Sequence, residues 1–124
     1  MKRILIAATL IAASVGAANA QDATAGATVF KKCNACHAVG PDAKNKVGPE
    51  LNGLDGRHAG SVANFNYSDA VKNSGITWNE QTFLEFINSP KGKIPGTKMA
   101  FPGIKEEADV KNLWAYLKQE GKAK

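Results

Sequence analysis

The chain has 124 residues, of which 44% are hydrophobic and 22% are charged, and its formal net charge is +5. This length supports one small domain, so the composition excludes a second domain, a membrane-spanning body and a large internal substrate cavity. Fourteen of the hydrophobic residues lie between Met1 and Ala20, which leaves the rest of the chain with few large apolar side chains. We therefore expect something other than side chains to fill part of the core.

The first 20 residues have the organisation of a secretory signal. Two basic residues precede an apolar run over residues 4–15, and a small-x-small tripeptide ends at Ala20. A bilayer span needs about 20 apolar residues, so this run is too short to cross a membrane. We predict that residues 1–20 are removed by cleavage after Ala20, and that residues 21–124 form a single exported domain in the periplasm.

The charge of the exported chain indicates the kind of partner that it suits. Removal of residues 1–20 takes away Lys2 and Arg3 and lowers the formal net charge from +5 to +3. Lysines alternate with acidic residues instead of forming a basic block, so no nucleic-acid partner is indicated. A mild positive surplus suits an acidic protein partner.

The first predicted helix is amphipathic and lies directly ahead of two cysteines. Asp22 and Thr24 are its candidate N-caps. Its apolar face has the spacing i, i+3, i+4 and i+7 and is formed by Gly26, Val29, Phe30 and Cys33. The face therefore carries the first cysteine, and the helix is expected to pack against whatever group that cysteine holds.

The cysteines lie in the run Cys33-Asn34-Ala35-Cys36-His37. This C-x-x-C-H pattern is the attachment sequence of c-type haem, in which two thiols add to the two vinyl groups and the histidine binds the iron. All three groups come from about one and a half turns of chain, so we expect the segment to be helical. A haem would also supply the missing core.

Three other interpretations of the cysteines compete with haem. A structural zinc site needs four ligands, and beyond these three the exported chain offers only His58 and no second C-x-x-C pair. A thioredoxin-like dithiol follows a strand, and no strand pattern flanks these cysteines. A structural disulfide is common in exported proteins. Covalent haem is favoured over all three.

A long loop and a short helix are predicted next. Residues 40–60 are rich in glycine and show no strand alternation, as is true of the whole chain. A structureless loop of this length is acceptable where it packs against a bound cofactor. Ser68 is expected to cap a short helix over residues 69–73.

Two longer helices follow. Thr77-Trp78-Asn79-Glu80 has the capping-box pattern, with Thr77 as N-cap and Glu80 as the third helical residue, and the helix that it opens is stopped by Ser89-Pro90. The last helix has acidic residues in its first turn, from Glu106 onward, and is closed by Gly121. Its apolar face is formed by Val110, Leu113, Trp114 and Leu117.

If His37 is one iron ligand, the second is expected to be Met99, the only methionine of the exported chain. Met99 lies in a loop over residues 94–103 that is interrupted by prolines and glycines, where no helix or strand face accounts for it. A His/Met pair is also typical of cytochromes c. His58 is the rival ligand, although an exposed loop histidine is the simpler interpretation.

Five stretches, in order and at matching spacing, give the chain a clear resemblance to the class I c-type cytochromes. They are residues 33–37, 47–54, 75–78, 94–101 and 113–117. The chain is especially similar to small bacterial cytochromes c2 and to mitochondrial cytochromes c. The resemblance implies an all-α cytochrome c fold, with three main helices, short helices and long loops wrapped around one covalently attached haem.

The resemblance also implies roles for residues around the haem. Pro49 would accept a hydrogen bond from the second ring nitrogen of His37 and fix its tautomer. The haem propionates, whose charge is costly to bury, would receive donors from Arg57, Tyr67 and Trp78.

Other roles implied by the resemblance concern the helix crossing and the methionine side of the haem. The first and last helices would meet through Gly26, Phe30, Leu113 and Tyr116. Thr97 would donate near a propionate or an internal water. Phe86 and Val71 stand where the mitochondrial branch has a tyrosine and an asparagine, so the water network beside Met99 is expected to differ.

The function implied is that of a one-electron carrier. With His37 and Met99 both bound to iron, no coordination position is open to oxygen, peroxide or substrate, and no general base or nucleophile lies nearby. The alternative is a haem peroxidase with an open sixth iron position. A third class is a thiol oxidoreductase or a small disulfide-stapled binding module.

Partner docking of such a carrier is expected to be brief and to depend on surface charge. In the family, lysines ring the exposed haem edge, and the corresponding residues here are Lys31, Lys32, Lys46, Lys91, Lys98 and Lys105. The implied partners are a quinol-cytochrome c oxidoreductase, a terminal oxidase, a photosynthetic reaction centre or a periplasmic dehydrogenase. The chain is expected to be a monomer that docks only transiently on membrane complexes.

Overall fold

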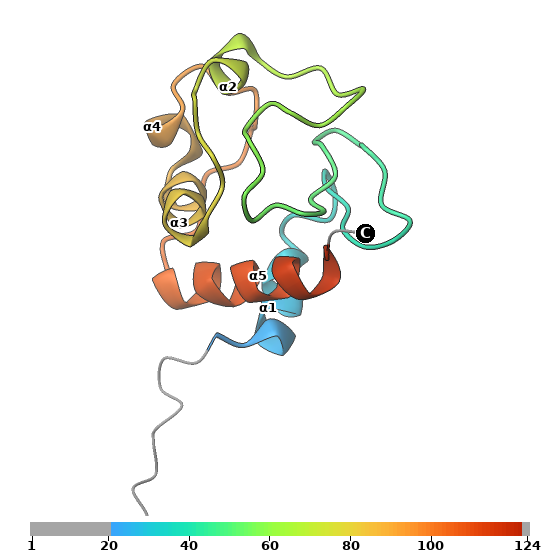
Figure 1. The fold of residues 1–124 in the computed structure, drawn as a ribbon. Helices are drawn as coiled ribbons and strands as arrows, with labels where there is room; N and C mark the ends of the chain where they lie inside the picture. Colours follow the sequence, from blue (N-terminus) through green and yellow to red (C-terminus); the bar gives the residue numbers. More distant parts are fainter. Residues whose placement is uncertain (1–20, 123–124) are drawn as a thin grey trace, which may run out of the picture.

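The computed structural model describes residues 21–122, so the predicted signal segment lies outside the described residues. Helices in this range follow the order α1 (Ala23–Phe30), α2 (Asp69–Lys72), α3 (Glu80–Asn88), α4 (Pro90–Lys93) and α5 (Glu107–Glu120). Helices α1 and α5 cross at one end of the molecule, and long loops form the side opposite α2, α3 and α4 (Figure 1). The only β pairing between residues 21 and 122 is an isolated bridge from His58 to Thr77, so the predicted all-α fold is confirmed.

The crossing of α1 and α5 is the most extensive contact between helices within residues 21–122. Asp22 caps α1, because its carboxylate accepts hydrogen bonds from the backbone N–H groups of Thr24 and Ala25. A Cβ atom on Gly26 would lie 2.0 Å from the backbone oxygen of Asn112 in α5. The rings of Phe30 and Tyr116 pack with centroids 5.3 Å apart. Glycine is therefore required where the two backbones meet.

The apolar face of α5 forms the centre of the core. Its four predicted residues, Val110, Leu113, Trp114 and Leu117, are each at most 2% exposed. The ring of Trp114 packs against Phe83 of α3 with centroids 5.0 Å apart. The predicted face of this helix and its closure at Gly121 are confirmed.

Three details of the helix ends differ from the predictions. Asn79, and not Thr77, caps α3: its side chain accepts from the Thr82 backbone N–H, and the Thr82 side chain accepts from the Asn79 backbone N–H in return. Glu80 is consequently the first residue of the helix. The chain leaves helical geometry at Ser89, which has a φ of −150°, but a new helix, α4, begins directly after it with Pro90 at its first position.

The loop between α1 and α2 is tied to the helices by its backbone. The Gly53 N–H donates to the carbonyl of Gly121, just after α5, over 2.7 Å. The Leu51 N–H donates to the carbonyl of Ala38 over 2.9 Å.

Ser68 caps α2 as predicted, although that helix ends at Lys72 and not at Asn73. No helix within residues 21–122 is long and apolar enough to cross a bilayer.

Candidate functional site

The two cysteines and the histidine lie in hydrogen-bonded turns that continue from α1. The helix ends at Phe30, whose carbonyl accepts from the Cys33 N–H over 2.8 Å. The carbonyl of Cys33 then accepts from the His37 N–H over 2.9 Å, which is the spacing of an α-helical bond. The sequence predicted that this segment is helical. In the structure it forms consecutive hydrogen-bonded turns and not one continuous helix.

Both thiols are free and half-buried. Burial raises the pKa of Cys33 to about 11, with a further rise from Cys36 and an opposing effect of Lys32. A thioredoxin-like dithiol would need a lowered pKa, so this environment does not favour that alternative. Residues 21–122 contain no group of three His, Cys, Asp or Glu side chains able to hold a metal ion, so the zinc alternative lacks a ligand set there.

The imidazole of His37 is held in one tautomer. Its Nδ1 lies 2.7 Å from the carbonyl oxygen of Pro49, which can only accept, so Nδ1 carries the proton and Nε2 keeps its lone pair. Burial lowers the pKa of His37; the Pro49 bond opposes this effect, and the charges of Arg57 and Lys46 add to it. The ring is therefore neutral at neutral pH, with Nε2 available to a metal.

Gly48 leaves room for the imidazole of His37, because it has no side chain. A Cβ atom at this position would lie 2.2 Å from Cε1 of His37, and the Gly48 N–H donates to the carbonyl of Cys36 over 2.7 Å. Any other residue would displace the imidazole or break the contact between the loop and the cysteine segment.

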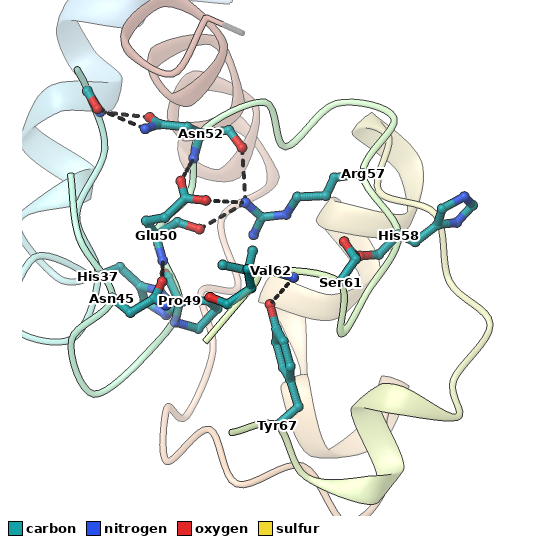
Figure 2. Close-up of polar contacts among 12 residues, drawn as sticks. His37, Asn45, Pro49, Glu50, Asn52, Arg57, His58, Ser61, Val62 and Tyr67 are labelled. Carbon is teal, nitrogen blue, oxygen red and sulfur yellow. Dashed lines mark hydrogen bonds and ion pairs between the residues drawn. The ribbon is translucent and has the colours of Figure 1, made fainter. Parts of the chain in front are cut away.

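Arg57 is the centre of a polar cluster in the loop half of the molecule (Figure 2). Its Nη1 donates to the carbonyls of Glu50 and Asn52 over 2.9 and 3.0 Å, and lies 3.5 Å from the Glu50 carboxylate. Burial lowers the pKa of Arg57, against the Glu50 charge, which raises it. Tyr67 accepts from the Val62 N–H over 3.1 Å, which leaves its own O–H proton free to donate.

Trp78 is joined to this cluster by its backbone. Its N–H donates to the carbonyl of Arg57 over 2.9 Å, and its carbonyl accepts from Gly56 over 2.8 Å. Every fully buried side-chain nitrogen and oxygen of the described residues has a hydrogen-bond partner. The indole nitrogen has none among residues 21–122, although Trp78 is only 8% exposed, so this nitrogen is not fully buried and its N–H is free to donate.

Met99 lies on a separate segment, half-buried against the core. Its backbone N–H donates to the hydroxyl of Thr97 over 3.3 Å, so Thr97 orders the methionine loop. Val71 also packs against the core, and Phe86 packs on Trp78 with ring centroids 5.1 Å apart. The side chains at both positions are apolar, as the sequence indicated.

His58 and the lysines lie on the surface. His58 is exposed, its Nδ1 lies 2.9 Å from the hydroxyl of Thr77, and it points away from the Arg57 cluster (Figure 2). All six lysines of the predicted ring are exposed. Two of them are anchored to backbone carbonyls: Lys46 to Asn34 over 2.7 Å and Lys105 to Asn88 over 2.6 Å.

Sequence reasoning missed two polar residues that organise the loop. The Asn52 amide accepts from the Gly40 N–H and donates to the Gly40 carbonyl, both over 2.8 Å. Asn45 accepts from the Glu50 N–H over 3.0 Å. These contacts join residues up to 12 positions apart, and no local pattern predicts them.

The donor set fits a c-type haem. Two free thiols precede a histidine whose Nε2 keeps its lone pair, Cys33 by one helical turn and Cys36 by one residue, and a thioether is available from Met99. Donors with unused capacity at Tyr67 and Trp78 match the acidic propionates.

Comparison with known proteins gives consistent results. A family model described as Cytochrome c matches residues 23–120. A protein named cytochrome c2 from Blastochloris viridis is 58% identical over 119 residues, covering 96% of this chain and 94% of the relative. A protein named cytochrome c-550 from Bradyrhizobium diazoefficiens is 62% identical over 105 residues, covering 82% of this chain and 77% of the relative.

A solved structure has the same arrangement of the chain. Cytochrome cH from Methylobacterium extorquens superposes with a TM-score of 0.75 at 44% identity. The match covers 79% of this chain and 98% of that one.

Proposed function

This chain belongs to the cytochrome c family, and we propose that it carries single electrons through the periplasm between redox complexes. Its cofactor is one covalently bound haem c, and it is an electron-transfer protein and not an enzyme. In the proposal, Cys33 and Cys36 hold the haem through thioethers, and His37 and Met99 bind its iron.

The observation that carries the proposal is the state of His37. The Pro49 carbonyl fixes the proton on Nδ1 and burial keeps the ring neutral, which supports a role of Nε2 as an iron ligand directly beyond two free thiols. When bound, the haem supplies a centre that alternates between ferrous and ferric states. A second ligand from Met99 would leave no position for substrate, which suits a carrier.

The remaining residues would orient the haem and exclude water from it. Arg57, Tyr67 and Trp78 would offer their N–H and O–H groups to the propionates, and Pro49 would keep the imidazole in one orientation. Thr97 supports this arrangement indirectly, because its hydroxyl orders the loop that carries Met99.

Partner docking would use the exposed lysines around the attachment segment and the methionine loop. Their charge suits an acidic surface on a quinol-oxidising complex, a terminal oxidase, a reaction centre or a periplasmic dehydrogenase. Such attraction speeds encounter more than it strengthens binding, and it weakens above about 0.1 M salt, where screening acts over about 10 Å. Export by the 1–20 signal, with cleavage after Ala20, would bring the chain to these partners.

Optical spectroscopy of the purified protein tests the ligand assignment. The haem should remain with the protein after acid-acetone extraction, and the ferric protein should show the near-infrared band of sulfur ligation. Met99→Ala should abolish that band, whereas the matched variant His58→Ala should retain it. High-spin iron in the unmutated protein would contradict the proposal and favour a peroxidase, and extractable haem would contradict covalent attachment.

Kinetics with candidate membrane complexes test the docking surface. Lys98→Gln should slow electron transfer at low salt, and the rate of the unmutated protein should fall steeply as salt is raised. Lys118→Gln is the matched control, because Lys118 lies outside the predicted ring on α5, 3.8 Å from Asp55. A rate independent of salt would exclude the lysine ring.

A further inference from the structure

We propose that Glu50 holds Arg57 in position and lowers the midpoint potential of the haem through the negative charge that it keeps beside this arginine. The inference rests on the proposed function, because it requires a haem whose propionates face Arg57. It concerns a carboxylate to which neither the sequence pattern nor the ligand set assigns a role.

Glu50 contacts Arg57 through both its backbone and its side chain. The Glu50 carbonyl accepts from Arg57 Nη1 over 2.9 Å, and the carboxylate Oε1 lies 3.5 Å from the same nitrogen. The other carboxylate oxygen accepts from the Asn52 N–H over 2.6 Å, and the Asn45 side chain accepts from the Glu50 N–H over 3.0 Å. The carboxylate is thus fixed beside the guanidinium (Figure 2).

This ion pair is shielded more than an ordinary surface pair. The side chains of Arg57 and Glu50 are 14% and 23% exposed. Charges with this degree of burial interact more strongly than surface charges, which water and salt screen. An open surface hollow of about 460 Å³ borders both side chains, so water still reaches the pair and the expected electrostatic effect is moderate.

The nitrogens of the Arg57 guanidinium fall into two groups, those bound to the loop and those free to donate. Nη1 is committed to Glu50 and Asn52, whereas Nε and Nη2 make no hydrogen bond to residues 21–122 and are free to face a propionate. The Glu50 charge offsets part of the positive charge that Arg57 would otherwise set against the ferric iron. Removing the Glu50 charge therefore favours the ferrous state and raises the midpoint potential.

Redox titration of the holoprotein with Glu50→Gln tests the inference. This variant keeps the shape of the side chain and removes its charge. At a fixed applied potential, the ferrous-to-ferric ratio should rise about threefold, which corresponds to about 28 mV at 59 mV per tenfold change for one electron. Glu50→Asp retains the charge and should stay close to the unmutated potential.

Asp55→Asn is the matched control. It removes the same charge five positions away in the chain, but Asp55 and its partner Lys118 are 52% and 50% exposed, so no measurable shift is expected. A second variant predicts the opposite sign. Asn45→Asp keeps the oxygen that accepts from the Glu50 N–H, loses the amide that donates to the Ala63 carbonyl, and adds a carboxylate to the cluster, so the potential should fall.

The outcomes separate this inference from the proposed function. An unchanged potential in Glu50→Gln, an equal shift in Asp55→Asn, or a rise in Asn45→Asp would overturn the role of Glu50. If Glu50→Gln does not yield holoprotein, Asn45→Asp alone decides by the sign of its shift. Extractable haem or high-spin iron in the unmutated protein would instead contradict the proposed function.

Discussion

Helices α1, α3 and α5 are held together by apolar side chains, whereas the loop from residue 38 to residue 62 is held by hydrogen bonds to a few polar ones. In the helical half, the face of α5 is at most 2% exposed, and Gly26 brings two backbones into contact. In the loop half, single side chains such as Asn52 and Arg57 each bind two separate backbone groups.

The two halves are therefore stabilised in different ways. Apolar packing is additive over many contacts and tolerates gradual change, whereas a polar side chain with several partners leaves all of them unpaired when it is removed. The proposed iron ligand His37 takes its orientation from the loop half, through Pro49. The helical half can therefore conserve the fold while changes in the loop alter the chemistry of the site.

The largest effect on the free energy of unfolding is expected for Gly26→Val in the helical half. A side chain would meet the backbone of Asn112, so the free energy of unfolding should fall by about 3 kcal/mol. Gly56→Ala is the control in the loop half: Gly56 has a φ of 88° but no atom within 4 Å of the added Cβ, so only the backbone cost of about 1 kcal/mol is expected. Guanidinium unfolding of both variants measures this, and equal losses would contradict the packing argument.

A smaller effect is expected for Asn52→Ala. The buried Gly40 would lose the partner of its N–H, and its carbonyl would keep only the Ala43 N–H, which should cost about 2 kcal/mol. Amide exchange at Gly40 should accelerate in this variant. The control is Asn66→Ala, which changes an exposed loop asparagine and should leave both stability and exchange unaltered. Slow exchange at Gly40 in Asn52→Ala would show that the loop does not depend on the hydrogen bonds between Asn52 and Gly40.

The helix cap provides a smaller and local test. Asn79→Ala should lower the free energy of unfolding by about 1 kcal/mol, because the Thr82 N–H loses its acceptor. Glu80→Ala should cost about 0.5 kcal/mol or less, since Glu80 contributes a charge to the first turn and an exposed hydrogen bond from Gln21. A larger loss in Glu80→Ala would instead support the Thr77 cap expected from the sequence.

The smallest expected effect is on how the stability of the protein depends on pH. Hydrogen bonds from Lys93 over 2.6 Å and Gln81 over 2.9 Å hold the pKa of Glu85 below its ordinary value of 4.5. The stabilisation is therefore present above the ordinary pKa and is lost as the pH falls through the lowered one. Melting temperatures between about pH 6 and about pH 3 should fall less steeply in Glu85→Gln than in the unmutated protein or in Glu106→Gln. Parallel curves would exclude the contribution.

Local patterns predicted the helical half well. The face of α5 followed from its spacing, and Asp22 was one of two candidate caps ahead of α1. The cap of α3 was predicted two residues too early, and the backbone shows why: Asn79 is extended with a φ of −144°, whereas Thr77 pairs with His58. α4 was missed because Pro90 was taken as a stop, although proline is also favoured at the first position of a helix.

The candidate site was predictable only in part. The cysteines and His37 form one local motif, and the Pro49 contact followed from the family resemblance. The links of Glu50, Asn52 and Arg57 bring together backbone groups that only the folded loop places side by side. A polar residue in a glycine-rich loop has no periodicity to reveal its partners, so their function could not be foreseen.

The bond from the Gly53 N–H to the Gly121 carbonyl also affects the chemical lifetime of the protein. Asparagine followed by glycine ages by deamidation, in which the glycine nitrogen attacks the asparagine side chain and expels ammonia. Here that nitrogen is engaged over 2.7 Å, and the Asn52 amide is held on both sides by Gly40. The end of α5 thus protects the Asn-Gly sequence while the chain is folded. Deamidation at Asn52 is therefore expected mainly in molecules that have unfolded.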